Sequence, residues 1–234
     1  MFKVENFFKQ MDGLPFPEIF AEKLTGFDDI TYVWDVLKRL QKEFIKQRVR
    51  QDILGTVENG AHLMGDDIYI GKGTHVEAGA MIVGPCIIGE DVEIRHGAYI
   101  RGHVLIGSGA VVGHCTEVIR SIFLPGAKAP HFNYVGDSIL GSKVNLGAGT
   151  KLSNFKNDGT EVKVAGAGTS FKTGLRKFGA ILGDGCQLGC NSVTNPGTVM
   201  GPNGRVYPNA TVSGLHAPLT IIKLRQTLEY GRIG

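Results

Sequence analysis

The sequence predicts an all-β solenoid, a parallel β-helix in which one aliphatic side chain returns at every sixth residue. From position 70 this register runs through Ile70, Val76, Ile82, Ile88, Ile94, Ile100, Ile106, Val112 and Val118. From Thr74 onward, the position two residues earlier holds a small or modest side chain, such as Ala80 or Cys86. The 34 glycines among 234 residues are about twice the usual share. These observations favour triangular coils of three six-residue sides over a sandwich of short strands, which would alternate with period two.

Residues 1–60 precede the repeat and carry one helical pattern, within residues 30–48. Its hydrophobic stripe comprises Val33, Leu37, Leu40 and Phe44, and the lysines at 38, 42 and 46 lie elsewhere. Asp28 and Asp29 stand where N-caps would be expected. We expect an amphipathic helix that packs on the end of the solenoid or on a neighbouring subunit. A helix lying on a membrane surface is the alternative.

Residues 61–214 form the expected solenoid. Glycine often follows the aliphatic position, as at Gly71, Gly89, Gly107 and Gly113, where a tight corner favours a residue without a Cβ penalty. The register returns, shifted, at Leu140, Leu146 and Leu152, and again at Leu182, Leu188, Met200, Val206 and Val212, with Thr194 as its polar member. Residues 18 apart should therefore stack in successive coils, about 4.8 Å apart.

The register fails near residues 125–133 and near 155–179, and we expect an insertion to project at each place. The second segment is basic, with Lys156, Lys163, Lys172, Arg176 and Lys177 opposed by Asp158 and Glu161. It is either a structural loop or an arm that contacts phosphates of CoA or of a sugar phosphate. Residues 215–234 should hold a short C-terminal helix, over 219–229, that covers the last coil.

Composition excludes several classes of protein. A net charge of +3 does not supply the concentrated basic face that nucleic-acid binding needs. No stretch approaches 18 uninterrupted apolar residues, so we expect no membrane span. The first 20 residues lack the pattern of a secretory leader, so a cytoplasmic, reduced protein is the expectation for a chain with four cysteines.

The stretch KAPHFNYVGDSILGSKVNLGAGTKLSNFKNDG, residues 128–159, resembles the acetyltransferase domain of the bifunctional glucosamine-1-phosphate acetyltransferase/N-acetylglucosamine-1-phosphate uridyltransferases. It has a histidine followed by Tyr and Gly-Asp, then Asn-x-Gly-Ala-Gly-Thr, then an Asn four residues on. The resemblance extends over residues 68–214 and implies a left-handed β-helix. Residues 1–60 are too short for the uridyltransferase domain and show no glycine-rich nucleotide loop, so that activity is not expected.

The resemblance also implies roles for individual residues. His131 falls on the catalytic base, and the sugar-phosphate contacts fall on Arg101, Tyr134, Asn145, Asn154 and, more loosely, Arg176. Acetyl-CoA contacts fall on the backbone of Ala148 and on Cys190, where a serine is usual. Phe155 stands where the family usually has Tyr, so one hydroxyl contact is lost.

A general base suits the implied chemistry because an amino sugar is largely protonated near neutral pH and must lose a proton before its nitrogen attacks a thioester. Histidine, with an ordinary pKa of about 6.5, matches that task. We therefore expect His131 to act in a ternary complex with acetyl-CoA and the sugar. A covalent cysteine route is disfavoured, since Cys86 and Cys186 occupy core positions. Cys115 and Cys190 lie off that register, and His114 beside Cys115 should point elsewhere.

Zinc is the other alternative, because similar solenoids include the γ-class carbonic anhydrases. His96 and His114 are 18 apart and should stack, but the five-residue His-to-His spacing of that family is missing, so no metal is expected.

The sequence thus predicts an acetyl-CoA-dependent N-acetyltransferase for an amino-sugar 1-phosphate, foremost glucosamine-1-phosphate. Two alternatives stay open: an acyltransferase for another amino sugar or amino-sugar nucleotide, and a non-catalytic scaffold that binds sugar nucleotides. Hexapeptide acyltransferases are trimers with sites between adjacent solenoids, so the resemblance implies a homotrimer.

Overall fold

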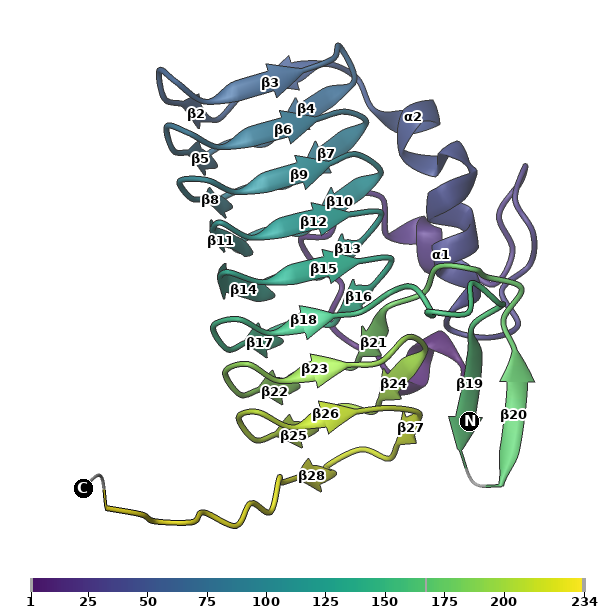
Figure 1. Ribbon diagram of the computed structural model, residues 1–234. Helices are drawn as coiled ribbons and strands as arrows, with labels where there is room; N and C mark the ends of the chain where they lie inside the picture. The colour runs from purple at the N-terminus through teal and green to yellow at the C-terminus, as the bar shows by residue number, and fades with distance from the viewer. Residues whose placement is uncertain (1, 167, 233–234) are drawn as a thin grey trace.

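The computed structural model describes residues 2–166 and 168–232 and has the architecture of a parallel β-helix, in which three sheets form the sides of a prism (Figure 1). Sheet A comprises β1 (Asp52–Ile53), β4 (Ile68–Ile70), β7 (Cys86–Ile88), β10 (Val104–Ile106), β13 (Ile122–Phe123), β16 (Ile139–Leu140), β21 (Ala180–Leu182), β24 (Thr198–Met200) and β27 (Leu215–His216). Sheet B comprises β2 (Thr56–Val57), β5 (His75–Val76), β8 (Glu93–Ile94), β11 (Val111–His114), β14 (Lys128–His131), β17 (Asn145–Leu146), β22 (Gln187–Leu188), β25 (Arg205–Val206) and β28 (Ile221–Ile222). Sheet C comprises β3 (His62–Met64), β6 (Met81–Val83), β9 (Tyr99–Arg101), β12 (Glu117–Ile119), β15 (Tyr134–Gly136), β18 (Lys151–Leu152), β23 (Val193–Thr194) and β26 (Thr211–Val212).

The predicted six-residue register is confirmed, because its aliphatic positions and the small positions before them form one buried cluster along the prism axis. The coils between Ile68 and Val118 pair residues 18 apart, as in Cys86 with Val104. The solenoid begins with β1 at Asp52, nine residues before the predicted boundary at 61. The glycines after the aliphatic position are needed for a reason other than corner geometry. A Cβ on Gly71 would lie 2.5 Å from the carbonyl oxygen of Gly89 in the next coil, so the stacked corners exclude a side chain.

The insertion predicted near residues 125–133 is wrong, because this segment is an ordinary part of a coil. A turn at 125–126 leads into β14, which pairs with β11 on one side and β17 on the other. The coils here pair residues 17 apart, as in Ile106 with Phe123 and Ile122 with Ile139. The register shifts because two coils have each lost a residue.

Both missing residues come from the corner that joins sheet C to sheet A, here called the C–A corner. Ser121 and Ser138 take the small inward position there and are buried. The Ser121 hydroxyl donates to the Ile119 carbonyl at 2.8 Å, and the Ser138 hydroxyl donates to the Gly136 carbonyl at 2.7 Å. These bonds satisfy the hydroxyls inside the core and leave no projecting loop.

The second predicted insertion, 155–179, is confirmed as a projecting arm. It leaves the C–A corner after β18 and contains an antiparallel hairpin, β19 (Lys163–Gly166) with β20 (Thr169–Lys172), that stands beside the solenoid (Figure 1). Val164 and Phe178 of this arm are buried. The Phe171 ring contacts the ring of Phe2 with centroids 5.0 Å apart, so the arm packs on the N-terminal segment.

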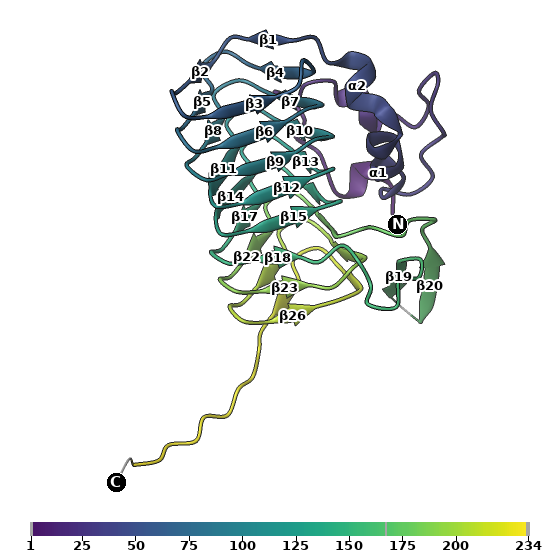
Figure 2. The same ribbon diagram turned by 45° about the horizontal axis from the view of Figure 1, so that its top comes forward.

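The N-terminal segment packs along a flank of the solenoid and not on its end, which corrects the prediction (Figures 1 and 2). It covers the outer face of sheet A, where the outward side chains of Ile87, Leu105, Ile122, Ile139, Ile181 and Val199 are buried. Strands of sheet A are therefore hydrophobic on both faces, as expected for a parallel sheet that is covered on both sides.

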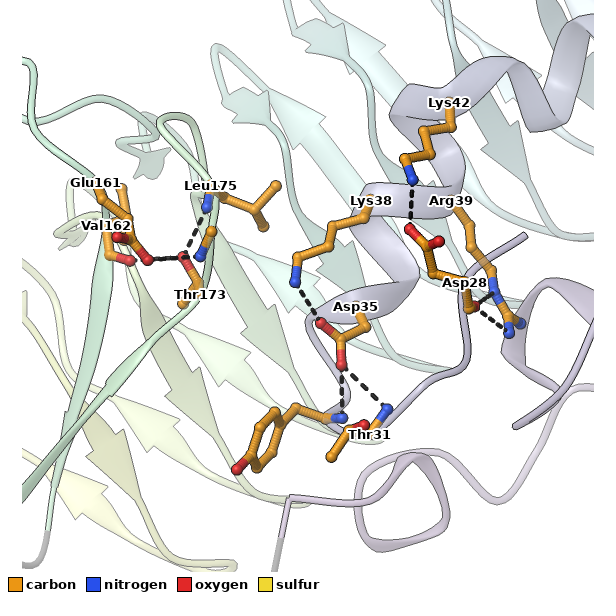
Figure 3. Close-up of polar contacts among 12 residues, drawn as sticks. Asp28, Thr31, Asp35, Lys38, Arg39, Lys42, Glu161, Val162, Thr173 and Leu175 are labelled. Carbon is orange, nitrogen blue, oxygen red and sulfur yellow. Dashed lines mark hydrogen bonds and ion pairs between the residues drawn. The ribbon is translucent and has the colours of Figure 1, made fainter. Parts of the chain in front are cut away.

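The predicted amphipathic helix is present and begins at Asp35. It comprises α1 (Asp35–Arg39), a π-helical stretch (Leu40–Phe44) and α2 (Ile45–Arg48), and all four stripe residues are fully buried. Asp28 and Asp29 are not its caps. The Asp35 carboxylate accepts hydrogen bonds from the backbone N–H groups of Thr31, at 3.1 Å, and Tyr32, at 2.8 Å, while Asp28 pairs with Lys42 (Figure 3). Within the described residues, no helix has the length and hydrophobicity to cross a membrane.

The predicted C-terminal helix over 219–229 is wrong. β27 and β28 continue the last coil, and residues 223–232 form neither helix nor strand and leave the solenoid as a tail (Figure 2). Leu224 and Leu228 have helical spacing, but they are 50% and 61% exposed. A helix this short is marginal unless one face is buried, and the tail buries none.

Candidate active site

Three of the predicted residues stack on the corner that joins sheet B to sheet C, here called the B–C corner. The backbone N–H of Gly149 donates to the His131 carbonyl at 3.0 Å, and the N–H of Asn191 donates to the Ala148 carbonyl at 2.8 Å. His131, Ala148 and Cys190 therefore occupy the same corner position in three successive coils. His131 ends β14 with an exposed side chain, so the predicted base and the two predicted acetyl-CoA contacts form one column on the surface.

The outer face of sheet C carries a second group of predicted residues. Arg101 donates to the Glu117 carboxylate at 2.5 Å, which raises the pKa of the Arg101 guanidinium. Tyr134 pairs with Glu117 across β12 and β15 and is half-buried. Burial, followed by the charge of Glu117, raises the pKa of the Tyr134 phenol, so this hydroxyl stays protonated and can donate a hydrogen bond. Arg101 already has a carboxylate partner, and an incoming phosphate would have to compete with it.

The absence of a side chain at Gly136 determines the orientation of the Tyr134 ring. A Cβ at Gly136 would lie 2.7 Å from the Tyr134 hydroxyl and 2.5 Å from Nδ2 of Asn154. The phenol ring therefore extends along its own strand, over the bare glycine, toward Asn154. This contact brings two predicted sugar-binding side chains together at the C–A corner.

The centre of this corner is Asp137, a fully buried carboxylate to which the sequence assigned no role. Arg120 binds it with two hydrogen bonds, from Nε at 2.6 Å and from a terminal nitrogen at 2.9 Å. Asn154 donates to it at 2.6 Å, and Gln41 of the N-terminal helix donates at 2.9 Å. The pKa of Arg120 is raised by this carboxylate. The Gly-Asp pair of the sequence pattern was the signal for Asp137, whereas the docking of Gln41 leaves no trace in a single sequence.

A cavity of about 420 Å³ opens beside this network. It is lined by Gln41, Arg120, Asp137, Phe155, Arg176 and Lys177. Phe155 forms a bridge with Lys177 where the arm leaves and rejoins the solenoid, which places Arg176 at the cavity. Arg120 and Asp137 largely neutralise each other, so Arg176 and Lys177 give the cavity a net positive charge. Such a cavity can hold an anion beside an apolar ring.

Asn145 is the predicted sugar-binding residue that the structure separates from the others. It lies on the outer face of sheet B, between Lys128 and Gln187 of the neighbouring strands. Tyr134 and Asn154 belong to sheet C and its corner. Outward side chains on two sides of a triangular prism diverge, so one protomer does not direct Asn145 and Asn154 at the same point.

The cysteines and stacked histidines are as predicted except at Cys115. Cys86 and Cys186 are buried in the core, and burial raises the pKa of each thiol to about 12. Cys115 and Cys190 are exposed. His114 does not point away from its neighbour, because its Nε2 lies 3.5 Å from the Cys115 sulfur. The rings of His96 and His114 stack with centroids 5.6 Å apart. Within residues 2–166 and 168–232, no group of three or more His, Cys, Asp or Glu side chains is arranged to hold a metal ion.

Known proteins resemble this chain in sequence and in fold. A family described as the GMPPB C-terminal domain matches residues 82–173. The bifunctional sugar-1-phosphate nucleotidylyltransferase/acetyltransferase of Sulfurisphaera tokodaii is 34% identical over 185 residues, which are 79% of this chain and 46% of that protein. The bifunctional protein GlmU of Methanococcus maripaludis is 40% identical over 191 residues, 81% of this chain and 46% of that protein. A solved structure, the UDP-N-acetylglucosamine acyltransferase of Francisella novicida, aligns with a TM-score of 0.49 and 16% identity, over 69% of this chain and 62% of that one.

The chain thus spans about half the length of the curated relatives that it matches. At 34% and 40% identity, the two matches each span about four-fifths of this chain. The predicted resemblance is confirmed, and the chain is a hexapeptide-repeat relative of the bifunctional GlmU and sugar-1-phosphate nucleotidylyltransferase/acetyltransferase proteins.

Proposed function

We propose that this chain is an acetyl-CoA-dependent N-acetyltransferase that acts on an amino-sugar 1-phosphate, with glucosamine-1-phosphate as the first candidate. The observation that carries the proposal is the column of His131, Ala148 and Cys190 on the B–C corner. A histidine exposed to solvent lies next to the backbone that would hold the thioester, so a base and an acyl donor can share one site. The names of the curated relatives, which include acetyltransferases and sugar 1-phosphates, support the same class of reaction.

His131 removes a proton from the ammonium or the attacking amine of the acceptor. The amine nitrogen then forms a bond to the thioester carbonyl carbon, the carbon–sulfur bond breaks, and the CoA thiolate leaves and takes up a proton. A general base of this kind contributes typically 10²- to 10⁴-fold to the rate. Arg176 and Lys177 bind the sugar phosphate in the proposed site, and Tyr134, Asn145 and Asn154 orient the sugar.

The acceptor site is proposed to lie between two copies of the chain in a homotrimer, because Asn145 and Tyr134 lie on different faces of the prism. The outer face of sheet B in one protomer would meet the outer face of sheet C in the next, so that Asn145 and Tyr134 contact one acceptor. Arg101 is less suited than Arg176 to bind the phosphate, because the Arg101 guanidinium already forms an ion pair with Glu117.

Thiol release from acetyl-CoA tests the proposal, with glucosamine-1-phosphate, galactosamine-1-phosphate and amino-sugar nucleotides as acceptors. We expect turnover with at least one sugar 1-phosphate, and a loss of 10²-fold or more in kcat for His131→Ala with an unchanged melting temperature. His62→Ala is the control, because His62 is also exposed but lies in the first coil. Full activity of His131→Ala would disprove the base assignment. No turnover with any acceptor would favour the non-catalytic scaffold.

A further inference from the structure

The N-terminal helix places one side chain, Gln41, at the cavity of the C–A corner. Its Nε2 donates to Oδ1 of Asp137 at 2.9 Å, and the residue lines the same 420 Å³ cavity as Arg176 and Lys177. Gln41 and Asp137 are 96 residues apart in the sequence. The contact therefore depends on how the N-terminal segment packs against the solenoid.

Two features hold Gln41 at this position. Arg39, two residues before Gln41, is 1% exposed and donates to the carbonyls of Ile19, Ala21 and Glu22. It also donates to the carbonyl of Asp28 (Figure 3), and these bonds together fix the helix to the rest of its segment. Directly after Gln41 the backbone leaves helical geometry, with Glu43 at φ 68°. A glutamate at positive φ is strained, and such strain persists where the surrounding contacts determine the conformation.

Gln41 differs from the other residues that line the cavity in its hydrogen-bonding capacity. Arg120, Arg176 and Lys177 carry only donors, and the Asp137 carboxylate already accepts from Arg120, Asn154 and Gln41. Among the described residues that line the cavity, Gln41 has the one uncharged side chain that both donates and accepts. Its hydrogen bond to Asp137 uses one of two N–H donors, so a donor and the carbonyl oxygen remain.

We propose that Gln41 is a specificity-determining residue that recognises a hydroxyl group of the acceptor sugar whose phosphate binds Arg176 and Lys177. This inference rests on the proposed function. A hydroxyl both donates and accepts, as the free half of a primary amide does, whereas a phosphate needs donors only. The segment before the solenoid then acts on the choice of acceptor, in addition to covering sheet A.

The test measures binding and turnover with glucosamine-1-phosphate and with analogues that each lack one ring hydroxyl. Wild-type protein should bind the parent about tenfold more tightly than the analogue that lacks the recognised hydroxyl, which corresponds to about 1.4 kcal/mol. Gln41→Met, of similar length but without hydrogen bonds, should bind both with similar Kd, measured by calorimetry without acetyl-CoA. Its KM for the acceptor should rise about tenfold, and its kcat and its KM for acetyl-CoA should not change.

Lys46→Ala is the matched control, because Lys46 lies on the same helix, is exposed and is absent from the cavity lining. If Gln41→Met discriminates among the analogues as wild type does, the inference is overturned, whatever the turnover. A fall in kcat at constant KM and constant discrimination would also overturn it, since that pattern indicates a structural role. If wild type binds the sugar phosphate but releases no CoA, the proposed reaction fails while the binding ratio still decides the role of Gln41. Absence of any sugar-phosphate binding by wild type would overturn both.

Discussion

Gly136 shows how a single residue prepares the candidate acceptor site. Because a Cβ there would fall 2.7 Å from the Tyr134 hydroxyl and 2.5 Å from the Asn154 amide, the glycine is what lets the two side chains meet. Gly136 has no positive φ, so a larger residue is excluded by close approach and not by backbone strain. The sequence pattern includes Gly136 in its Gly-Asp pair, but it gave this glycine no role, whereas it assigned Tyr134 and Asn154 to the sugar.

We expect Gly136→Ala to displace Tyr134 and to raise the KM for the acceptor at least tenfold, since the alanine methyl occupies the position of the phenol edge. Steady-state kinetics with the acceptor varied checks this expectation. Gly231→Ala, whose Cβ meets open space, is the control. An unchanged KM would show that the Tyr134 orientation does not contribute to acceptor binding.

The four cysteines differ in the accessibility and reactivity of their thiols. Cys86 and Cys186 are buried and their pKa values are raised from 9.0 to about 12, so their reactive thiolate form is scarce at neutral pH. We expect iodoacetamide at pH 7.5 to label Cys115 and Cys190 in the folded protein and all four cysteines in urea. Peptide mass spectrometry reads out each position. Labelling of Cys86 without urea would contradict its place in the core.

Among the elements, the N-terminal segment depends on one buried cation. Arg39 donates five hydrogen bonds to backbone carbonyls of Ile19, Ala21, Glu22 and Asp28. Burial lowers the pKa of its guanidinium from the ordinary value, while the charges of Asp29, Asp28 and Asp35 act in the opposite direction. The solenoid core contains no part of this network.

Arg39→Leu should therefore loosen residues 2–50 while leaving the coils intact. The carbonyls left without donors cost about 1–3 kcal/mol each where they stay buried, so this segment should open first. Hydrogen exchange followed by mass spectrometry should show faster exchange in residues 2–50 and unchanged exchange in β10 and β13. Equal acceleration in both regions would mean that segment and solenoid unfold as one unit.

The elements also show where sequence reasoning fails. The coils from Ile70 to Val118 were predicted because each hydrophobic side chain enters one axial core. The C-terminal helix was predicted wrongly, since Leu224 and Leu228 have helical spacing but no surface to cover. The shortened corners look like an insertion in sequence, because Ser121 and Ser138 are polar residues at inward positions. Their hydroxyl bonds to corner carbonyls become evident only in three dimensions.

At the scale of the molecule, the separation of Asn145 from Tyr134 is the feature with the most consequence for the candidate site. The sequence assigned both to one sugar, and the fold places them on different faces. The residues of the B–C column were predicted one by one from the family resemblance, and their stacking became evident only in the fold. The contacts of Asp137 with Arg120 and Gln41 depend on the packing of three separate elements.

We expect a trimer by light scattering, and Tyr134→Ala and Asn145→Ala each to be nearly inactive alone. If one acceptor site takes these residues from two protomers, randomly mixed trimers of the two variants should recover about a quarter of wild-type activity, because one site in four is intact. Refolding the variants together at equal amounts and measuring CoA release checks this. No recovery would place both residues of each site in one protomer, and a monomer would remove the shared site altogether.

The two shortened corners also affect how this chain must be compared with other solenoids. Arg120, Asp137 and Asn154 contact one another at intervals of 17 residues, while the coils before them repeat at 18. An alignment that slides the chain in steps of 18 puts Ser138 opposite Arg120 and splits the network into unrelated columns. One gap at each shortened corner, after Val118 and after Val135, restores the columns. Equivalent positions in the coils of this chain are thus found by counting corners and not by counting residues.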